Sequence, residues 1–600
     1  MSNSFNSSFL PILVCAVSLI LTLSAPAHSA TSPAAQSPTC SGIPWPAVDG
    51  LGRSLPLPDE AGPTKPGKFV GIFYFLNTGQ WPPFEKGPFD VSKILSADPD
   101  AIKKPDSPLW GPQNSPHFWG EPLFGYYHAE DPWVIRRHAN LLSDAGIDTL
   151  IFDTTNRVTF RNVYMKICEV FTQVRKEGGQ TPQLVFMVNT EAKATADELF
   201  NDLYKPGLYP DLWFHWQGKP LMICDPEKAS PEVKDFFTLR RAHWPFEMKN
   251  TPYAWHWEAT FPQPYGFTDD PNVPEQVNVA VAQNLRAEDG KVTNMSRGDA
   301  RGRSFHDGQQ HIEPGSVNYG YNFQEQWGRA FQLNPPFVMV TGWNEWIAGK
   351  FAVEGEPIIF CDQYSQEFSR DTELSKSSHQ DNYYYQLIAN VRRYKGVPPL
   401  PKATPAKTID IKGPFSQWAE VGPEYTDAYG DTLPRDFAGV DRLHYTNTTG
   451  RNDFVVVKAA RDGANLYFYA RTREPITPST DNHWMMLLID ADQNPSTGWE
   501  GYDFIVNHQV KSPTVSMLER NTGGWQWEPV PNIEVPLRVE GNELQLAIPR
   551  AALGLPTSDT PLSFDFKWTD NLQNPGDVQD FYLSGDTAPA GRFKYRFLTK

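Results

Sequence analysis

Residues 132–153 read PWVIRRHANLLSDAGIDTLIFD, and this stretch decides the fold. Its first part, Pro132–Asp144, spaces apolar residues at a helical period and has proline in the first turn, as an amphipathic helix does. Its last part, Thr149–Asp153, is a short apolar run typical of a buried strand. A helix followed closely by a buried strand is the repeating unit of a parallel sheet.

The same alternation extends on both sides, over residues 67–396. The other candidate strands are Phe69–Leu76, Leu184–Val188, Pro220–Cys224, Ala254–Glu258, Val277–Ala282 and Phe337–Thr341. The other candidate helices are Tyr164–Arg175, Ala196–Tyr204, Pro231–Arg241 and Tyr321–Leu333. This α/β pattern best fits a (β/α)8 barrel with long loops. A doubly wound open sheet is the alternative, although no Gly-x-Gly-x-x-Gly opens a helix to indicate its dinucleotide-binding form.

A second region follows a change in composition. Residues 397–411, which begin VPPLPKATPA, are predicted to form a proline-rich linker. Beyond it the apolar residues recur at every second position in short runs between turn residues. These runs are Phe454–Ala459, Asn465–Ala470, Trp484–Ile489, Tyr502–Asn507, Glu543–Ile548 and Phe564–Trp568. Residues 412–600 are therefore predicted to form a β-sandwich.

The N-terminus predicts export. The apolar segment Phe9–Leu23 is too short for a comfortable membrane span, and Ala25-Pro26-Ala27 supplies a small-x-small cleavage site. Residues 1–27 are expected to be a signal peptide of a secreted or periplasmic protein, which leaves no membrane association after cleavage. An uncleaved anchor is the alternative, because no Lys or Arg precedes the apolar segment. Residues 28–66, rich in Pro, Ser and Ala, are expected to form an extended lead-in.

Composition narrows the partners. The 600 residues carry a net charge of −17, so nucleic acid is not an expected partner. Aromatic residues make up 13% of the chain, which suits packed cores and also the flat surfaces that stack on sugar rings. Cleavage would leave Cys40, Cys168, Cys224 and Cys361, which allow three disulfide pairings that the sequence does not distinguish.

Carboxylates follow several predicted barrel strands, where side chains face the open mouth. They are Asp153, Glu191, Asp225, Glu258 and Glu345. Such a cluster suits either paired acid–base catalysis or a hard cation. The alternative for each one is a helix cap or a turn, above all for Asp225 and Glu191.

Glu345 is the strongest candidate, because it lies in VTGWNEW directly after the strand Phe337–Thr341. A carboxylate between Trp343 and Trp346 is partly desolvated, which raises its pKa and suits a general acid. Asn344 can bind a sugar hydroxyl or fix the carboxylate, and the two indole rings can form a platform for a pyranose. The alternative is a structural carboxylate under an aromatic lid.

The run Trp343–Trp346 resembles the endo-α-mannosidases of glycoside hydrolase family 99, the α-1,3-glucanases of family 71 and the related WbsX-like domains. The resemblance extends over 67–396 and implies a glycosidase barrel. In the mannosidase pattern a second catalytic Glu stands three residues after the first, where this chain has Ala348. The mannosidase mechanism therefore does not carry over whole. The second carboxylate is expected from another strand, with Glu258 first and Asp153 second.

Aromatic and polar side chains on predicted loops complete the expected cleft. In the WHWE run at 255–258, strand alternation would place the two Trp on one face and His256 with Glu258 on the other. The alternative is a strand that buries both indole rings. Arg303 lies on a polar loop and could clamp an anionic group. Substrate contacts are expected from Trp119, Tyr127, Glu191, Trp255, His256, Arg303 and Tyr319, besides Trp343, Asn344 and Trp346.

The second region has a candidate cation loop. Asp490, Asp492 and Asn494 alternate in DADQN and offer hard oxygen ligands for Ca²⁺; a surface turn with local hydrogen bonds is the alternative. This loop, WTDN at 568–571 and DFYLSGDTAPAGRF at 580–593 resemble family 9-like carbohydrate-binding modules. The resemblance implies a module over 412–600 that binds sugar or serves as a structural appendage.

Together these features predict a secreted glycoside hydrolase that cleaves a poly- or oligosaccharide through paired carboxylates including Glu345. No cofactor is expected for catalysis, with structural Ca²⁺ expected only in the C-terminal region. Metal-dependent hydrolysis is disfavoured because no HExxH signature occurs. The alternative function is a non-catalytic carbohydrate-binding or surface protein that has lost one catalytic carboxylate, at Ala348.

Overall fold

The computed structural model describes residues 40–600 except 113, 248, 354, 377 and 558–560. The predicted signal peptide 1–27 and the first part of the predicted lead-in lie outside the described residues. None of the helices in the described part is long and apolar enough to traverse a bilayer.

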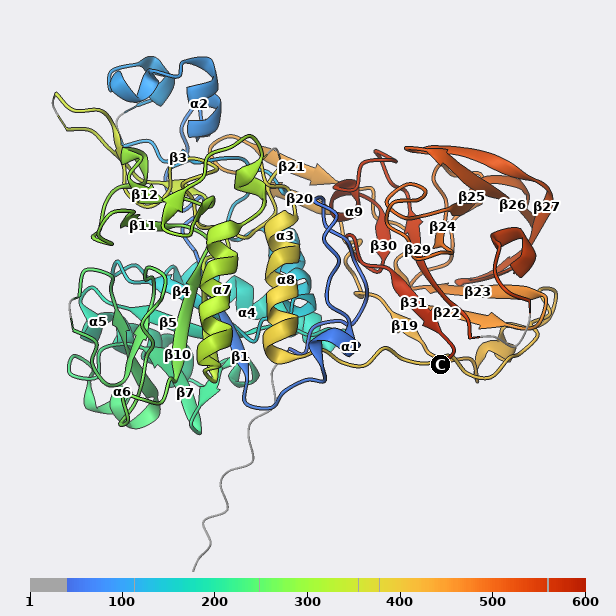
Figure 1. The fold of residues 1–600 in the computed structure, drawn as a ribbon, viewed down its shortest axis with the longest axis horizontal. Coiled ribbons are helices and arrows are strands. Elements are labelled where there is room, and N and C mark those ends of the chain that lie inside the picture. Colours follow the sequence, from blue (N-terminus) through green and yellow to red (C-terminus); the bar gives the residue numbers. More distant parts are fainter. Residues whose placement is uncertain (1–39, 113, 248, 354, 377, 558–560) are drawn as a thin grey trace, which may run out of the picture. The chain divides into compact units, whose positions relative to one another are not determined.

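Eight parallel strands form the first sheet (Figure 1). They are β1 (Phe69–Tyr74), β4 (Thr149–Thr154), β5 (Gln183–Val188), β7 (Lys219–Ile223), β8 (Thr238–His243), β9 (Ala254–His256), β10 (Gln276–Ala280) and β15 (Phe337–Thr341). Around the sheet the order is β10-β15-β1-β4-β5-β7-β8-β9, so each strand lies beside the next one in the chain. The side chain of Gln276 connects the two end strands. Its Nε2 donates to the carbonyl oxygen of His256 (2.9 Å) and its Oε1 accepts from the His256 N–H (2.8 Å). The nearly closed sheet confirms the predicted barrel.

Helices follow most of the strands. They are α3 (Pro132–Asp144), α4 (Arg161–Lys176), α5 (Ala192–Leu199), α6 (Pro231–Phe236), α7 (Tyr321–Leu333) and α8 (Asn382–Lys395). The connections after β8 and β9 contain no helix in their described residues. The predicted helix Pro231–Arg241 is wrong in its second half, because α6 ends at Phe236 and β8 begins at Thr238. Arg240 interrupts the apolar pattern of β8, which is why the sequence does not reveal this strand.

Shorter elements lie in the connections. They are α1 (Pro58–Ala61), β2 (Phe89–Asp90), α2 (Val91–Ala97), β3 (His117–Phe118), β6 (His215–Trp216), β11 (Gln283–Arg286), β12 (Ala300–Arg301), β13 (Phe305–His306), β14 (Gln309–Gln310), β16 (Ile347–Ala348), β17 (Lys350–Phe351) and β18 (Ile359–Phe360). β16 pairs with β3 across the mouth end of the barrel sheet.

The barrel interior is packed with large apolar side chains and is closed at the N-terminal ends of the strands by one buried ion pair. Glu275, just before β10, accepts two hydrogen bonds from the guanidinium of Arg240 (2.5 and 2.7 Å). It also accepts from the indole nitrogens of Trp216 (2.9 Å) and Trp255 (2.8 Å). Trp255 therefore lies deep in the barrel, away from the mouth where the sequence analysis placed it.

The C-terminal region is antiparallel, as the predicted β-sandwich requires (Figure 1). Its strands are β19 (Tyr425–Thr426), β20 (Arg435–Ala438), β21 (His444–Asn447), β22 (Phe454–Arg461), β23 (Asn465–Thr472), β24 (Met486–Asp490), β25 (Phe504–Ser512), β26 (Val515–Gly523), β27 (Gln526–Glu540), β28 (Glu543–Pro549), β29 (Ser563–Asp570), β30 (Asp586–Ala588) and β31 (Tyr595–Leu598), with a short helix α9 (Asp580–Leu583). The long strand β27 pairs with β26 at one end and with β28 at the other, so it connects the two halves of the sheet.

The described part of the predicted lead-in packs against both regions. The ring of Trp45 lies 5.4 Å from that of Tyr425 and 5.3 Å from that of Tyr595. Arg392 on α8 donates to the carbonyl oxygens of Ile43 (2.7 Å) and Trp45 (2.8 Å). The four described cysteines are all free thiols, so none of the three possible disulfide pairings is formed.

Removal of the Glu275 carboxylate tests the ion pair at the bottom of the barrel. Glu275→Ala leaves Arg240 buried without a counter-charge, which is expected to lower the free energy of unfolding by about 3–5 kcal/mol. The matched control is Glu247→Ala, which breaks the partly exposed pair with Arg241 and is expected to cost about 0–1 kcal/mol. Denaturant unfolding measures both, and equal losses in the two variants would contradict a structural role for the buried pair.

Candidate active site

A cavity of about 310 Å³ opens where the barrel strands end. Its walls are aromatic, amide and acidic. The residues around it are Phe73, Phe75, Asp153, Thr155, Asn156, Asn189, Trp244, Pro245, Phe246, Trp257, Asn284, Val292, Glu345, Asp362 and Arg370. Two of the predicted catalytic residues, Asp153 and Glu345, therefore share one cavity.

Arg370 lies at the centre of the acidic groups. Its Nη2 donates to Oε2 of Glu345 (2.9 Å), and its Nη1 donates to Oε2 of Glu258 (3.1 Å). Oδ1 of Asp362 lies 3.7 Å from the same Nη2. One guanidinium thus faces three carboxyl groups, so the cluster carries more negative than positive charge whenever all three ionise.

This imbalance favours a proton on the cluster at neutral pH. Burial raises the pKa of Glu345 to about 8 and that of Glu258 to about 7; Arg370 opposes both shifts, while Asp362 reinforces them. Burial alone would lower the pKa of Arg370, but the two glutamates raise it overall, so the guanidinium stays charged. Because Arg370 balances only one carboxylate, protonation of a glutamate removes the charge that has no partner.

Residues in the connection between β15 and α8 hold both the backbone and the side chain of Glu345. The backbone N–H of Glu345 donates to Oδ1 of Asp371, whose Oδ2 accepts from the indole of Trp119 (2.8 Å). Gln363 donates from Nε2 to Oε2 of Glu345 (2.5 Å) and accepts the N–H of Arg370 at its Oε1 (2.9 Å). The donors to the Glu345 carboxyl, Gln363 and Arg370, both bind Oε2, so Oε1 is the oxygen left to carry a proton.

The neighbours of Glu345 in the WNEW run do not line the cavity. Trp343, Asn344 and Trp346 are each at most 1% exposed. Asn344 binds the backbone of Phe75 at both its N–H (2.8 Å) and its carbonyl oxygen (3.1 Å). Trp346 stacks on Trp119 with 4.6 Å between ring centroids. The prediction of an indole platform for sugar at Trp343 and Trp346 is therefore wrong, because these side chains turn inward and hold the ends of β1 and β15.

Five other predicted substrate contacts also lie elsewhere. Tyr127 is buried and donates to Glu373 (2.8 Å), and Arg303 is buried and donates to the carbonyl oxygen of Asp371 (2.8 Å). His256 is buried with its ring 4.2 Å from that of His243, and burial lowers its pKa to about 3. Glu191 pairs with Arg157 on the surface, and Tyr319 is exposed beside the ring of Tyr321. Trp119 stacks on Trp346 and does not line the cavity either. None of the predicted substrate contacts therefore lines this cavity.

Glu258 reaches the cluster through Arg370, but it does not line the cavity. β9 ends at His256, so Glu258 departs from the strand alternation expected for WHWE. The side chain is fully buried, and its Oε1 accepts from the N–H of Asn284 (3.0 Å). Ala348 is also buried, in β16, and does not line the cavity. No local motif in the sequence signals four further residues of the cavity, which are Trp244, Phe246, Asp362 and Arg370.

The predicted calcium ligands in the C-terminal region are only partly together. Oxygen atoms of Asp490, Asp492 and Asp503 lie within 4.8 Å of one another, so Asp503 takes the place expected for Asn494. Asn494 instead accepts from the N–H of Ser496 (3.1 Å), as in a local turn. The ammonium of Lys594 already binds Asp490 (2.8 Å). Calcium at this loop stays a prediction.

Comparison with solved structures finds a similarity over about half of the chain. The structure of the GH99 endo-alpha-mannosidase from Bacteroides thetaiotaomicron covers 54% of this chain and 97% of its own, with 11% sequence identity and a TM-score of 0.32. A second structure of that enzyme from the same organism, in complex with bis-tris-propane, covers 54% and 96%, with 14% identity and a TM-score of 0.30. No protein-family model and no curated protein sequence matches the chain. Similarity at this level says nothing of activity, which has to be inferred from the cavity itself.

Proposed function

We propose that the chain is a glycoside hydrolase that cleaves a poly- or oligosaccharide in the cavity at the barrel mouth. The observation that carries this proposal is Glu345, a buried carboxyl group with a pKa raised to about 8 that lines an aromatic cavity beside a second carboxylate. Cleavage of a glycosidic bond needs an acid that protonates the leaving oxygen and a second carboxylate that assists the anomeric carbon or a water.

Glu345 has the properties of the acid. At neutral pH its raised pKa keeps the proton that the leaving oxygen requires, and its Oε2 is fixed by Arg370 and Gln363. After transfer the new carboxylate is stabilised at once, because the guanidinium of Arg370 is already 2.9 Å away. The acid is therefore held in place by the same group that stabilises its conjugate base.

Asp362 is the partner that the geometry favours. Its side chain is 51% exposed and lines the cavity, so it is accessible to a sugar or a water. It lies 3.7 Å from the Arg370 nitrogen that binds Glu345, so the two carboxyl groups are near one another around the same guanidinium. Asp153 also lines the cavity, but its Oδ1 already accepts from the N–H and the hydroxyl of Thr155 (3.0 and 2.7 Å).

Glu258 is better assigned as a positioning residue than as the expected second catalytic carboxylate. It does not line the cavity, and it accepts a hydrogen bond from the guanidinium of Arg370. By sharing Arg370 it weakens the pairing of that group with Glu345, and so helps to keep the pKa of Glu345 high.

The cavity walls suit a carbohydrate. The indole rings of Trp244 and Trp257 lie 5.4 Å apart, and Phe246 is 67% exposed, so flat apolar surfaces are available for the faces of sugar rings. Asn156 and Asn189 line the same space and can bind hydroxyl groups. The proposed reaction needs no cofactor. Export through residues 1–27 and sugar binding by the C-terminal region are parts of the proposal that derive from the sequence alone.

Substitution of the two carboxyl groups tests the assignment. Glu345→Gln and Asp362→Asn keep the shape of each side chain but remove its titrating group, so each is expected to lower turnover by about 10²–10⁴-fold with the fold retained. Product mass on a panel of glycans and polysaccharides measures the activity, and circular dichroism checks the fold. The matched control is Asp225→Asn, which lies outside the cavity and is expected to keep wild-type turnover.

Two results would contradict the proposal. Near wild-type turnover of folded Glu345→Gln on a cleaved glycan would remove Glu345 from catalysis. Binding of a glycan by the wild-type chain without any cleavage across the panel would favour the alternative, a non-catalytic carbohydrate-binding protein.

The pH profile tests the role of Glu258. Glu258→Gln frees Arg370 to pair fully with Glu345, which stabilises the ionised form of Glu345 and lowers its pKa. The alkaline limb of kcat/KM, which reports the acid of the free enzyme, is therefore expected to move to lower pH, while turnover at the optimum falls by less than in Glu345→Gln. An unmoved alkaline limb in this variant would show that Glu258 does not act on Glu345 through Arg370.

A further inference from the structure

Three buried aspartates and the half-buried Asp427 lie together in the C-terminal region, far from Glu345 in the sequence. Asp427 and Asp431 follow β19, Asp453 directly precedes β22, and Asp586 begins β30. Asp431, Asp453 and Asp586 are each at most 5% exposed. One carboxylate oxygen from each of Asp427, Asp431 and Asp586 lies within 4.8 Å of the other two. Like charges this close are costly to bury without a counter-charge.

The surrounding side chains do not fully compensate this charge. Oδ2 of Asp427, Oδ1 of Asp431 and Oδ1 of Asp453 are buried and accept no hydrogen bond from the described residues. Two arginines approach other oxygens of the cluster without close contact. Nη1 of Arg137 lies 3.5 Å from Oδ2 of Asp431, and Nη1 of Arg473 lies 3.9 Å from Oδ2 of Asp453.

A buried lysine is near but is used elsewhere. Lys567 donates from its ammonium to the carbonyl oxygen of Pro589, and burial lowers its pKa to about 7.

The geometry suits a hard divalent cation. Calcium binds six to eight oxygen atoms at about 2.3–2.6 Å, so ligands on opposite sides of the ion lie about 4.6–5.2 Å apart. Three oxygens within 4.8 Å of one another can therefore share one ion. The cluster offers only carboxylate oxygens and contains no His or Cys. Oxygen ligands favour calcium over zinc.

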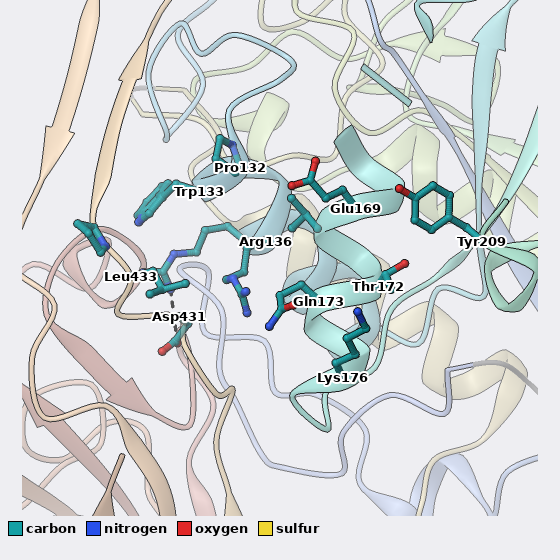
Figure 2. A pocket seen from close by; sticks show the side chains of 13 residues that line it. Pro132, Trp133, Arg136, Glu169, Thr172, Gln173, Lys176, Tyr209, Asp431 and Leu433 are labelled. Atoms are coloured by element: carbon teal, nitrogen blue, oxygen red, sulfur yellow. Dashed lines mark ion pairs between the residues drawn. The ribbon is translucent and has the colours of Figure 1, made fainter. Parts of the chain in front are cut away.

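Two cavities give access to the cluster. Asp431 lines a cavity of about 380 Å³ against α3 and α4, with Trp133 and Arg136 beside it (Figure 2). Asp427 lines another, of about 440 Å³, together with Asp144. An ion from solution can thus reach the carboxylates.

We propose that Asp427, Asp431 and Asp586 bind one calcium ion, with Asp453 beside them as a further carboxylate. The ion joins two segments, the chain after β19 and the start of β30, and so stabilises the C-terminal region. This site is separate from the loop at Asp490 and Asp492, and it does not depend on the proposed glycosidase activity.

Metal content of the full chain tests the proposal. The protein is freed of metal with a chelator, incubated with CaCl₂, passed through a desalting column and analysed by mass spectrometry for bound calcium. Asp431→Asn is expected to bind one calcium fewer than the wild type, whereas the matched control Asp492→Asn is expected to keep the calcium at this cluster. Melting curves of the wild type are expected to shift upward by several degrees on addition of CaCl₂, with a smaller shift for MgCl₂.

The control also separates the two acidic clusters. Calcium that is lost in Asp492→Asn but kept in Asp431→Asn would overturn the proposal, because the ion would belong to the other loop. A wild-type chain that takes up no calcium, or only magnesium, would overturn it too. If Asp431→Asn does not fold, a crystal structure of the calcium-loaded wild type decides, since an ion peak among the three carboxylates is required.

Discussion

The guanidinium of Arg370 is the group on which the barrel mouth depends. It is buried and binds carboxylates from the ends of two strands, Glu258 after β9 and Glu345 after β15. Without that positive charge the two glutamates would be buried with no counter-charge, and two ionised carboxylates side by side are costly to bury. With only one positive charge the cluster still has a surplus of acid groups. The same arrangement therefore makes the mouth stable and keeps a proton in it.

The two ends of the barrel differ in the balance of their buried charges. At the bottom, one arginine, Arg240, faces one carboxylate, Glu275, whose oxygens also accept from two indole nitrogens. The charges there are equal and the carboxylate is fully bonded, so nothing is left to react. At the mouth, Arg370 faces three carboxyl groups beside an open cavity. The mouth therefore combines an excess of carboxyl groups with a cavity that two of them, Glu345 and Asp362, line.

Much of the barrel could be predicted from the sequence because its elements carry their own pattern. Pro132–Asp144 and Phe337–Thr341 have the same bounds in the sequence and in the structure. β8 was missed because Arg240, buried against Glu275, breaks the apolar run that marks the other strands. A buried charge of this kind is stabilised by a residue distant in sequence, and no local pattern contains it.

The site could be predicted only in part, for a related reason. Glu345 could be predicted because it is a carboxylate that directly follows a buried strand. Side chains alternate between the two faces only as far as the strand extends, so the directions in which Trp343 and Trp346 point could not be deduced. Asp362 and Arg370 lie in the connection between β15 and α8, where no long helix or strand gives a period. Their positions follow from the fold of the whole barrel rather than from their neighbours in the chain.

The central claim is that Glu345 holds a proton at neutral pH, and infrared spectroscopy tests it most directly. The account predicts that the wild-type chain at pH 7, below the Glu345 pKa of about 8, shows a protonated carboxylic acid band that Glu345→Gln lacks. The band should disappear from the wild type when the pH is raised well above that pKa. If the wild type and Glu345→Gln show the same carboxylic acid absorption at pH 7, Glu345 is already ionised there, which would contradict the account.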